Sequence, residues 1–190
     1  ADVEVIALGA QVLAAFNMLD QTVLHLNTLG DTPSRDAYRA ALIDYFSGHK
    51  DQLSDDSLGR LEKNPLRILD SKDKSDRAVV EAAPVFDDYL TSEAADFFAE
   101  VRQGLDDLGV AYIRDPRLVR GLDYYCHTAF EFVTDALGAQ GTVIGGGRYD
   151  GLAEIMGGPA TPGVGWAGGI ERLAMLADQT MEEQEAPCPV

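Results

Sequence analysis

The spacing of apolar residues predicts helices in the first part of the chain. Residues 2–17 carry apolar side chains at i, i+4 and i+7, which is the period of one helix face. The same period follows a Thr-Pro pair that suits a helix start, and it predicts a helix over residues 32–47. Two further helices are expected over residues 75–83 and 92–108. The charged stretch 60–72 contains a proline and is expected to be a loop between helices.

Alternating apolar and polar residues predict a strand at residues 22–28 and more strands in the second half of the chain. The later strands are expected at residues 110–113, 123–133, 141–147 and 163–167, followed by a helix over 170–178. Strand 123–133 has apolar and polar groups on both faces, which favours a sheet covered on both sides. Short glycine turns between consecutive strands favour an α+β fold with an antiparallel sheet, into which the helical block 31–108 is inserted.

The composition is that of a globular protein outside the membrane. The 190 residues are 46% hydrophobic and 25% charged, and no apolar run approaches the roughly 20 residues of a membrane span. A net charge of −17 does not attract nucleic acid, so any RNA contact must come from local basic spots or from parts outside this chain. The chain starts without Met and ends in Pro-Cys-Pro-Val, and we expect it to be a fragment.

The cysteines and histidines are dispersed along the chain. Cys126 and Cys188 lie far apart, and the three histidines show no metal-ligand spacing. We therefore expect no resident metal, no disulfide framework and a reducing, cytoplasmic location.

Three short stretches in the strand-rich half could carry chemistry. Arg120–Tyr125 combines an arginine, which can grip a carboxylate or phosphate, with two tyrosines that can wall a small polar ligand. Gly145–Gly151 and Gly163–Leu173 are glycine-rich, and glycine lets backbone approach a ligand closely. Gly145–Gly151 fits neither a P-loop nor a dinucleotide-binding turn. Taken singly, Arg120–Tyr125 is better explained by a surface Arg–Asp pair and two core tyrosines. A strand-end kink would explain Gly145–Gly151, and a packed strand–helix junction with a solvated Glu–Arg pair would explain Gly163–Leu173.

Together these stretches resemble the motifs of the histidyl-tRNA synthetase family of class II aminoacyl-tRNA synthetases. Arg120–Tyr125, continuing to Thr128–Glu131, looks like the family's Arg-Gly-Leu-Asp-Tyr-Tyr and Thr-x-Phe-Glu motif. Gly146–Asp150 looks like its Gly-Gly-Arg-Tyr-Asp motif, and Gly165–Leu173 like class II motif 3. The stretch 64–72 is similar to part of the insertion domain of the bacterial enzymes.

The resemblance implies a division of the chain. Residues 1–30 and 109–179 would belong to the class II catalytic core, with a helical insertion domain at 31–108. Residues 180–190 would be a linker toward an anticodon-binding domain outside this chain.

The resemblance also implies an aminoacyl-tRNA ligase that uses histidine, ATP with substrate-bound Mg²⁺, and tRNA(His), and that forms a homodimer when full-length. Arg120 would be catalytic, placed between the histidine carboxylate and the α-phosphate of ATP. The implied histidine-binding residues are Arg120, Tyr124, Tyr125, Gly146, Gly147 and Tyr149. The implied ATP-binding residues are Arg120, Gly169 and Arg172.

Two other interpretations remain open at the level of sequence. A regulatory subunit of ATP phosphoribosyltransferase shares parts of the tyrosine and glycine motifs but lacks the insertion block. A binding module could keep the fold without activity. Since the family's motifs 1 and 2 would precede residue 1, we expect this chain alone to be inactive or nearly so.

Overall fold

A five-stranded mixed sheet organises the computed structural model, which describes residues 1–69, 71–119, 124–138 and 141–178. The strands are β1 (Val23–Thr28), β2 (Ile113–Arg114), β3 (Cys126–Val133), β4 (Thr142–Arg148) and β5 (Val164–Gly168). Their order is β2-β1-β3-β4-β5, and every neighbouring pair is antiparallel except β1 and β2, which are parallel. The expected α+β class is confirmed. The sheet differs from the expected antiparallel one at its edge, where β2 pairs with β1 in parallel.

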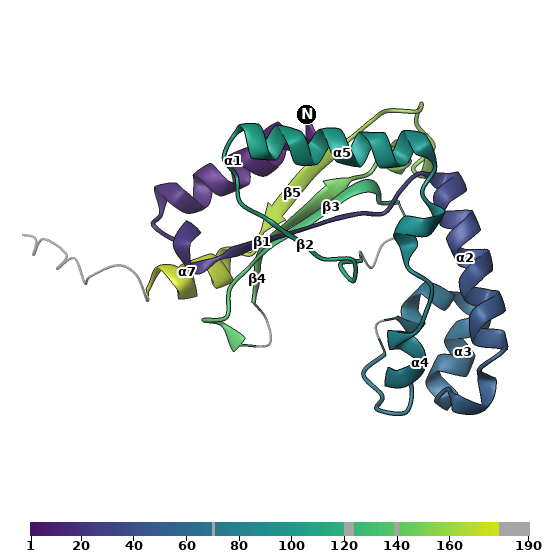
Figure 1. Ribbon diagram of the computed structural model, residues 1–190. Coiled ribbons are helices and arrows are strands. Elements are labelled where there is room, and N and C mark those ends of the chain that lie inside the picture. Colours follow the sequence, from purple (N-terminus) through teal and green to yellow (C-terminus); the bar gives the residue numbers. More distant parts are fainter. Residues whose placement is uncertain (70, 120–123, 139–140, 179–190) are drawn as a thin grey trace, which may run out of the picture.

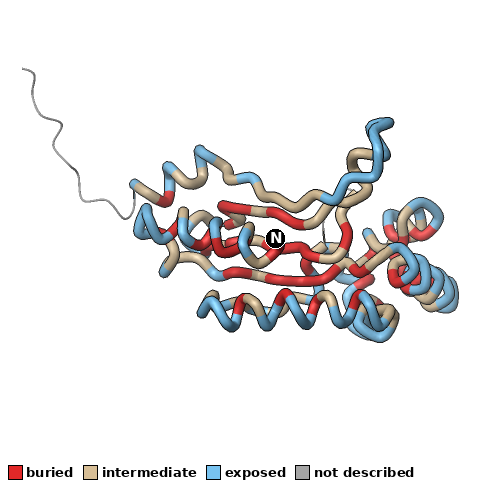
Figure 2. Tube along the Cα trace, turned by 90° about the horizontal axis from the view of Figure 1, so that it is seen from above, coloured by how far each residue is buried: buried red, intermediate tan, exposed pale blue. Residues whose placement is uncertain are grey.

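Two long helices cover one face of the sheet. α1 (Asp2–Ala15) and α5 (Ser92–Asp107) lie side by side above the strands (Figure 1), and both contact the sheet. Burial follows this arrangement, because the strands and the inner sides of the helices hold the buried residues (Figure 2). The largest fully buried side chains of this core include Ile6, Leu13, Leu26, Leu105, Phe130, Phe132 and Ile144. Alternate residues of β1 and β3 therefore supply the floor on which α1 and α5 pack.

Two shorter helices complete the strand-rich half of the fold. α6 (Leu152–Ile155) follows β4, and α7 (Ile170–Ala177) follows β5 after a single residue. Leu176 of α7 is fully buried in the same core as α1 and α5.

A second core lies in the helices between β1 and α5. It is built by α2 (Thr32–Ser47), α3 (Asp55–Lys63) and α4 (Arg77–Glu81), with 3-10 turns at Lys50–Gln52, Pro65–Ile68 and Phe86–Tyr89. A further 3-10 turn, Leu19–Gln21, precedes β1. Its buried side chains are Tyr38, Leu42, Phe46, Leu53, Leu61, Ile68 and Val79. These helices hang from one end of the sheet (Figure 1). The predicted 31–108 block therefore contains a separate core, although α5 at its end packs on the sheet.

The loop expected over residues 60–72 is wrong at its start, where α3 continues to Lys63. Ser54 caps α3 by accepting a hydrogen bond from the Ser57 amide, and Asp55 and Asp56 occupy the first turn. With only Leu61 as a buried apolar side chain, the helix lacks the apolar period that would have revealed it.

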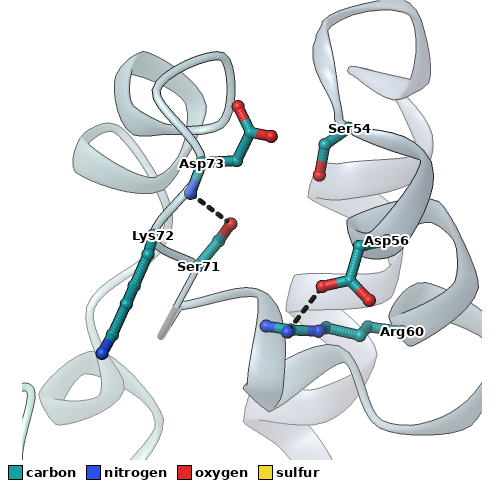
Figure 3. Close-up of a pocket in the computed structure, with 6 residues that line it drawn as sticks. All are labelled: Ser54, Asp56, Arg60, Ser71, Lys72 and Asp73. Carbon is teal, nitrogen blue, oxygen red and sulfur yellow. Dashed lines mark hydrogen bonds and ion pairs between the residues drawn. The ribbon is translucent and has the colours of Figure 1, made fainter.

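A buried carboxylate, Asp76, connects the segments of this second core. It has no exposed surface and accepts hydrogen bonds from the hydroxyls of Ser54, Ser57 and Ser71, and from the Ser54 amide. Burial raises the pKa of the Asp76 carboxyl, but these hydrogen bonds outweigh it and hold the pKa at about 2. An open cavity lies beside the network (Figure 3), and there Arg60 pairs with Asp56.

Asp76→Asn should therefore loosen the second core. The pKa of Asp76 is lowered in the folded state, so its stabilisation is present above pH about 4 and is lost as the pH falls through about 2. We expect the variant to lose about 2 kcal/mol at pH 7 and less at lower pH. Hydrogen exchange of the amides of residues 50–80 measures it. Asp73→Asn, which removes an exposed carboxylate from the same loop, is the control. Equal protection of these amides from hydrogen exchange in Asp76→Asn and Asp73→Asn at pH 7 would contradict the structural role of Asp76.

Candidate active site

Three tyrosine rings gather where β3 begins and β4 ends. The ring centroids of Tyr124 and Tyr125 lie 4.8 Å apart, and Tyr149 stands edge-on to both at 6.4 Å and 6.2 Å. All three rings are half-buried, so each keeps surface that a ligand can contact. Paired aromatic walls that carry hydroxyls suit a small planar polar group.

Glycines on β4 and β5 make room for these rings. A Cβ atom on Gly147 would lie 3.1 Å from Cδ1 of Tyr125, and one on Gly165 would lie 2.9 Å from the hydroxyl oxygen of Tyr149. Gly147 and Gly165 face each other across the β4–β5 ladder. Gly163, against whose backbone the Tyr149 ring also packs, completes a group that we name the glycine floor: Gly147, Gly163 and Gly165. A larger residue at Gly163 or Gly165 would displace Tyr149, and one at Gly147 would collide with the Thr128 carbonyl oxygen, 2.6 Å from the Cβ position, as well as crowd Tyr125.

Gly146 points to the other side of the sheet. A Cβ atom on it would lie 2.6 Å from Cζ of Phe130 and 2.6 Å from Cβ of Trp166, in the core under α1. The glycine at this position is therefore required by packing. Gly146 was expected to bind histidine, and only its backbone could contribute to such a pocket.

A β-bulge at the start of β3 sets the direction of Tyr125. The register between β3 and β4 shifts between Cys126 and Ala129, and His127 adopts φ +46°, in the left-handed region. The His127 ring consequently lies against Phe97 of α5 at 4.6 Å between ring centroids, whereas the Tyr125 ring lies over Gly147, the cross-strand partner of Ala129. The regular alternation expected over residues 123–133 is therefore wrong at His127. Burial lowers the pKa of this histidine, which favours its neutral form.

Arg148 anchors the backbone on either side of Tyr149 by pairing with Asp2 and Asp150. Its guanidinium donates to both carboxylate oxygens of Asp2 in α1 and, at 2.9 Å, to Asp150. Asp150 in turn accepts from the Gly163 amide at 3.0 Å, which holds the β5 entry against the tyrosine. Burial raises the pKa of Asp2, but the hydrogen bonds from Arg148 and Thr128 outweigh it and lower the pKa overall. At the level of sequence, Arg148 and Asp150 were noted only as part of the Gly-Gly-Arg-Tyr-Asp motif and were given no role, because Asp2, the partner of Arg148, is distant in sequence.

Arg172 and Gly169 lie at the far end of β4. Arg172, in the first turn of α7, donates from Nη1 to the Thr142 carbonyl at 2.7 Å, and the Gly169 amide donates to Val143. β4 runs from Thr142 to Arg148, which corresponds to roughly 20 Å of strand. The tyrosines and Arg172 therefore mark the two ends of an extended site. Arg120, the predicted catalytic residue, lies outside the described residues.

One contact at the site came from a residue that the sequence did not single out. Arg35 of α2 donates from Nη1 to the Tyr125 carbonyl at 2.7 Å, across 90 positions of sequence. No local pattern signals such a contact.

The described residues contain no group of three or more His, Cys, Asp or Glu side chains placed to hold a metal ion. In the same part of the chain, no helix is long and apolar enough to cross a membrane.

Comparisons with known proteins agree on one family. The family model described as histidyl-tRNA synthetase matches residues 1–173. The chain is 65% identical over 176 residues to the histidine–tRNA ligase of Rhodospirillum rubrum, covering 93% of this chain and 42% of that protein. It is 61% identical to that of Gluconacetobacter diazotrophicus, covering 100% of this chain and 45% of that protein. The apo histidyl-tRNA synthetase of S. aureus matches with a TM-score of 0.77 at 36% identity, over 96% of this chain and 45% of that one. The chain thus spans less than half the length of these relatives.

Removing the Arg148 side chain should destabilise the fold strongly. Arg148 and Asp2 are 13% and 6% exposed, so Arg148→Gln leaves a carboxylate buried without its cation. We expect a loss of about 3–5 kcal/mol in the free energy of unfolding, measured by urea denaturation. The control is Arg77→Gln, which breaks an exposed pair with Glu81 and should leave stability nearly unchanged. Similar small effects of both substitutions would rule out a structural role for the Asp2–Arg148 pair.

Proposed function

The chain belongs to the histidyl-tRNA synthetase family, and we propose that it supplies the histidine pocket and part of the ATP site of a histidine–tRNA ligase. The full-length enzyme would activate histidine with ATP to histidyl-adenylate and then transfer histidine to tRNA(His). The observation that carries the proposal is the cluster of three tyrosine rings over the glycine floor.

The tyrosine cluster would receive the imidazole of histidine. Tyr149 stands edge-on to Tyr125 at 6.2 Å between ring centroids, and Tyr124 lies against Tyr125 at 4.8 Å. The imidazole is planar and has two nitrogens, so aromatic walls with hydroxyls can both pack on it and hydrogen-bond to it. The backbone of Gly147 and Gly165 would form the base of this pocket.

The opposite end of β4 would receive the phosphates of ATP. Arg172 carries a planar donor set suited to phosphate, and the N-terminus of α7 adds the positive end of a helix dipole. Gly169 precedes that helix and would border the nucleotide. Mg²⁺ would arrive bound to ATP and add charge neutralisation at the phosphates.

The chemistry needs positioning more than proton transfer. The histidine carboxylate attacks the α-phosphorus, a carboxylate–phosphorus bond forms, and pyrophosphate leaves with the electron pair of the broken bond. The nucleophile is already ionised at neutral pH, so the protein must align the two substrates and stabilise the developing charge. Arg120 would supply that stabilisation between carboxylate and α-phosphate, a contribution of about 2.7–4 kcal/mol for a single comparable donor.

The remaining features of the full-length protein are also part of this proposal. Residues 1–30 and 109–179 would form part of the catalytic core, 31–108 the insertion domain and 180–190 a linker to an anticodon-binding domain. The dimer contacts, the motif 2 arginine and the cytoplasmic location would belong to the full-length protein.

Histidine-dependent ATP–pyrophosphate exchange tests the proposal. We expect exchange by the full-length protein, little or none by the 190-residue chain alone, and a fall of roughly 10²–10³-fold in full-length Arg120→Ala. Exchange by the short chain would show that the residues outside it are dispensable for activation. Absence of exchange in the full-length protein would favour a regulatory or binding module.

Gly165→Ala tests the pocket itself. The added methyl group would overlap the Tyr149 hydroxyl and move the ring, so kcat/KM for histidine in the full-length protein should fall about 10- to 100-fold. Gly151→Ala is the matched control, because a Cβ atom there meets nothing within 4 Å. Equal activity of the two variants would exclude Tyr149 from the pocket.

A further inference from the structure

Arg35 connects the helical block to the tyrosine cluster. It lies in the first turns of α2, and its Nη1 donates to the backbone carbonyl of Tyr125 at 2.7 Å. Its Nη2 also reaches the Thr32 hydroxyl at 3.3 Å, which orients the guanidinium. A charged donor to a backbone carbonyl is one of the stronger protein hydrogen bonds.

The start of α2, from which Arg35 projects, is itself firmly held. Asp31 caps the helix by accepting from the Ser34 amide at 2.8 Å, and it also accepts from the Thr91 hydroxyl at 2.7 Å. The Ser34 hydroxyl accepts from the Thr91 amide at 2.9 Å. Burial raises the pKa of Asp31, but these hydrogen bonds outweigh it and bring the pKa to about 2. The joint between α2 and the start of α5 therefore fixes where the Arg35 guanidinium can reach.

The backbone at Tyr125 lies outside the regular ladder. β3 begins at Cys126, and the bulge at His127 interrupts its pairing with β4 until Ala129. A side chain from outside the sheet can therefore set the position of the Tyr125 backbone. That position directs the ring, which already lies close to Gly147.

We propose that Arg35 is a positioning residue for the histidine pocket, which makes the geometry of Tyr125 depend on the docking of the helical block. This inference rests on the proposed function of the tyrosine cluster. Arg35 itself would contact neither histidine nor ATP. It would act on the pocket through the Tyr125 carbonyl.

The chain offers a matched control in Arg39. Arg35 and Arg39 are one turn apart on α2 and line the same cleft of about 450 Å³, together with Lys63 and Arg67. Arg39 is exposed at the surface. Arg35→Gln and Arg39→Gln therefore remove the same charge from the same cleft, whereas only the first removes the donor to Tyr125.

The experiment is ATP–pyrophosphate exchange by the full-length protein without tRNA, so that any tRNA contact of the cleft is silent. We expect Arg35→Gln to raise KM for histidine about tenfold, with KM for ATP and the thermal midpoint nearly unchanged. Arg35→Lys, which keeps a charged donor, should restore part of the loss, and Arg39→Gln should match the wild type. If Arg35→Gln only reduced the fraction of folded protein, the apparent kcat would fall and KM for histidine would stay unchanged.

The outcomes separate this inference from the function on which it rests. Wild-type exchange with an unchanged KM for histidine in Arg35→Gln would overturn the positioning role and leave the proposed function standing. Equal rises in Arg35→Gln and Arg39→Gln would also overturn it, because charge in the cleft would then be the cause. Absence of wild-type exchange would remove the proposed function and, with it, this inference.

Discussion

The close approach of tyrosine rings to glycine backbone is the constraint on which the site depends. Tyr149 lies over Gly163 and Gly165 at distances that leave no space for a Cβ atom, and Tyr125 lies close to Gly147, where a Cβ atom would also meet the Thr128 carbonyl oxygen at 2.6 Å. Burying ring surface against a flat backbone holds the rings without filling the space in front of them. The glycines of β4 and β5 thus have two functions, since Gly146 lets Phe130 and Trp166 pack on the opposite face.

Hydrogen-bonded carboxylates hold the parts of this acidic chain together. Asp2 joins α1 to β4 through Arg148, Asp31 joins α2 to the start of α5, and Asp76 joins the segments around α3. Each is surrounded by donors, which is the condition under which a buried carboxylate stays ionised without a large penalty. Although the net charge is −17, these carboxylates act as structural acceptors: Asp2 and Asp76 are buried, and Asp31 is half-buried.

The sequence predicted the features that depend on local pattern. The α+β class and the approximate positions of most strands followed from alternation and turn signals, although β2 lies at Ile113–Arg114 and was expected at 110–113. The grouping of Tyr124, Tyr125 and Tyr149 with Gly147 came only from the resemblance to the family. The direction of Gly146 and the turn of His127 toward α5 did not, because a bulge shifts the register in a way that alternation does not record. The contact of Arg35 with Tyr125 could not be predicted from the sequence either, since it depends on how two distant segments dock.

A crystal structure of the full-length protein with bound L-histidine tests the central claim most directly. The account predicts the imidazole against the rings of Tyr125 and Tyr149, above the backbone of Gly147 and Gly165, with its carboxylate directed along β4 toward Arg172. Histidine bound elsewhere, with the space beside the tyrosine rings empty, would contradict it.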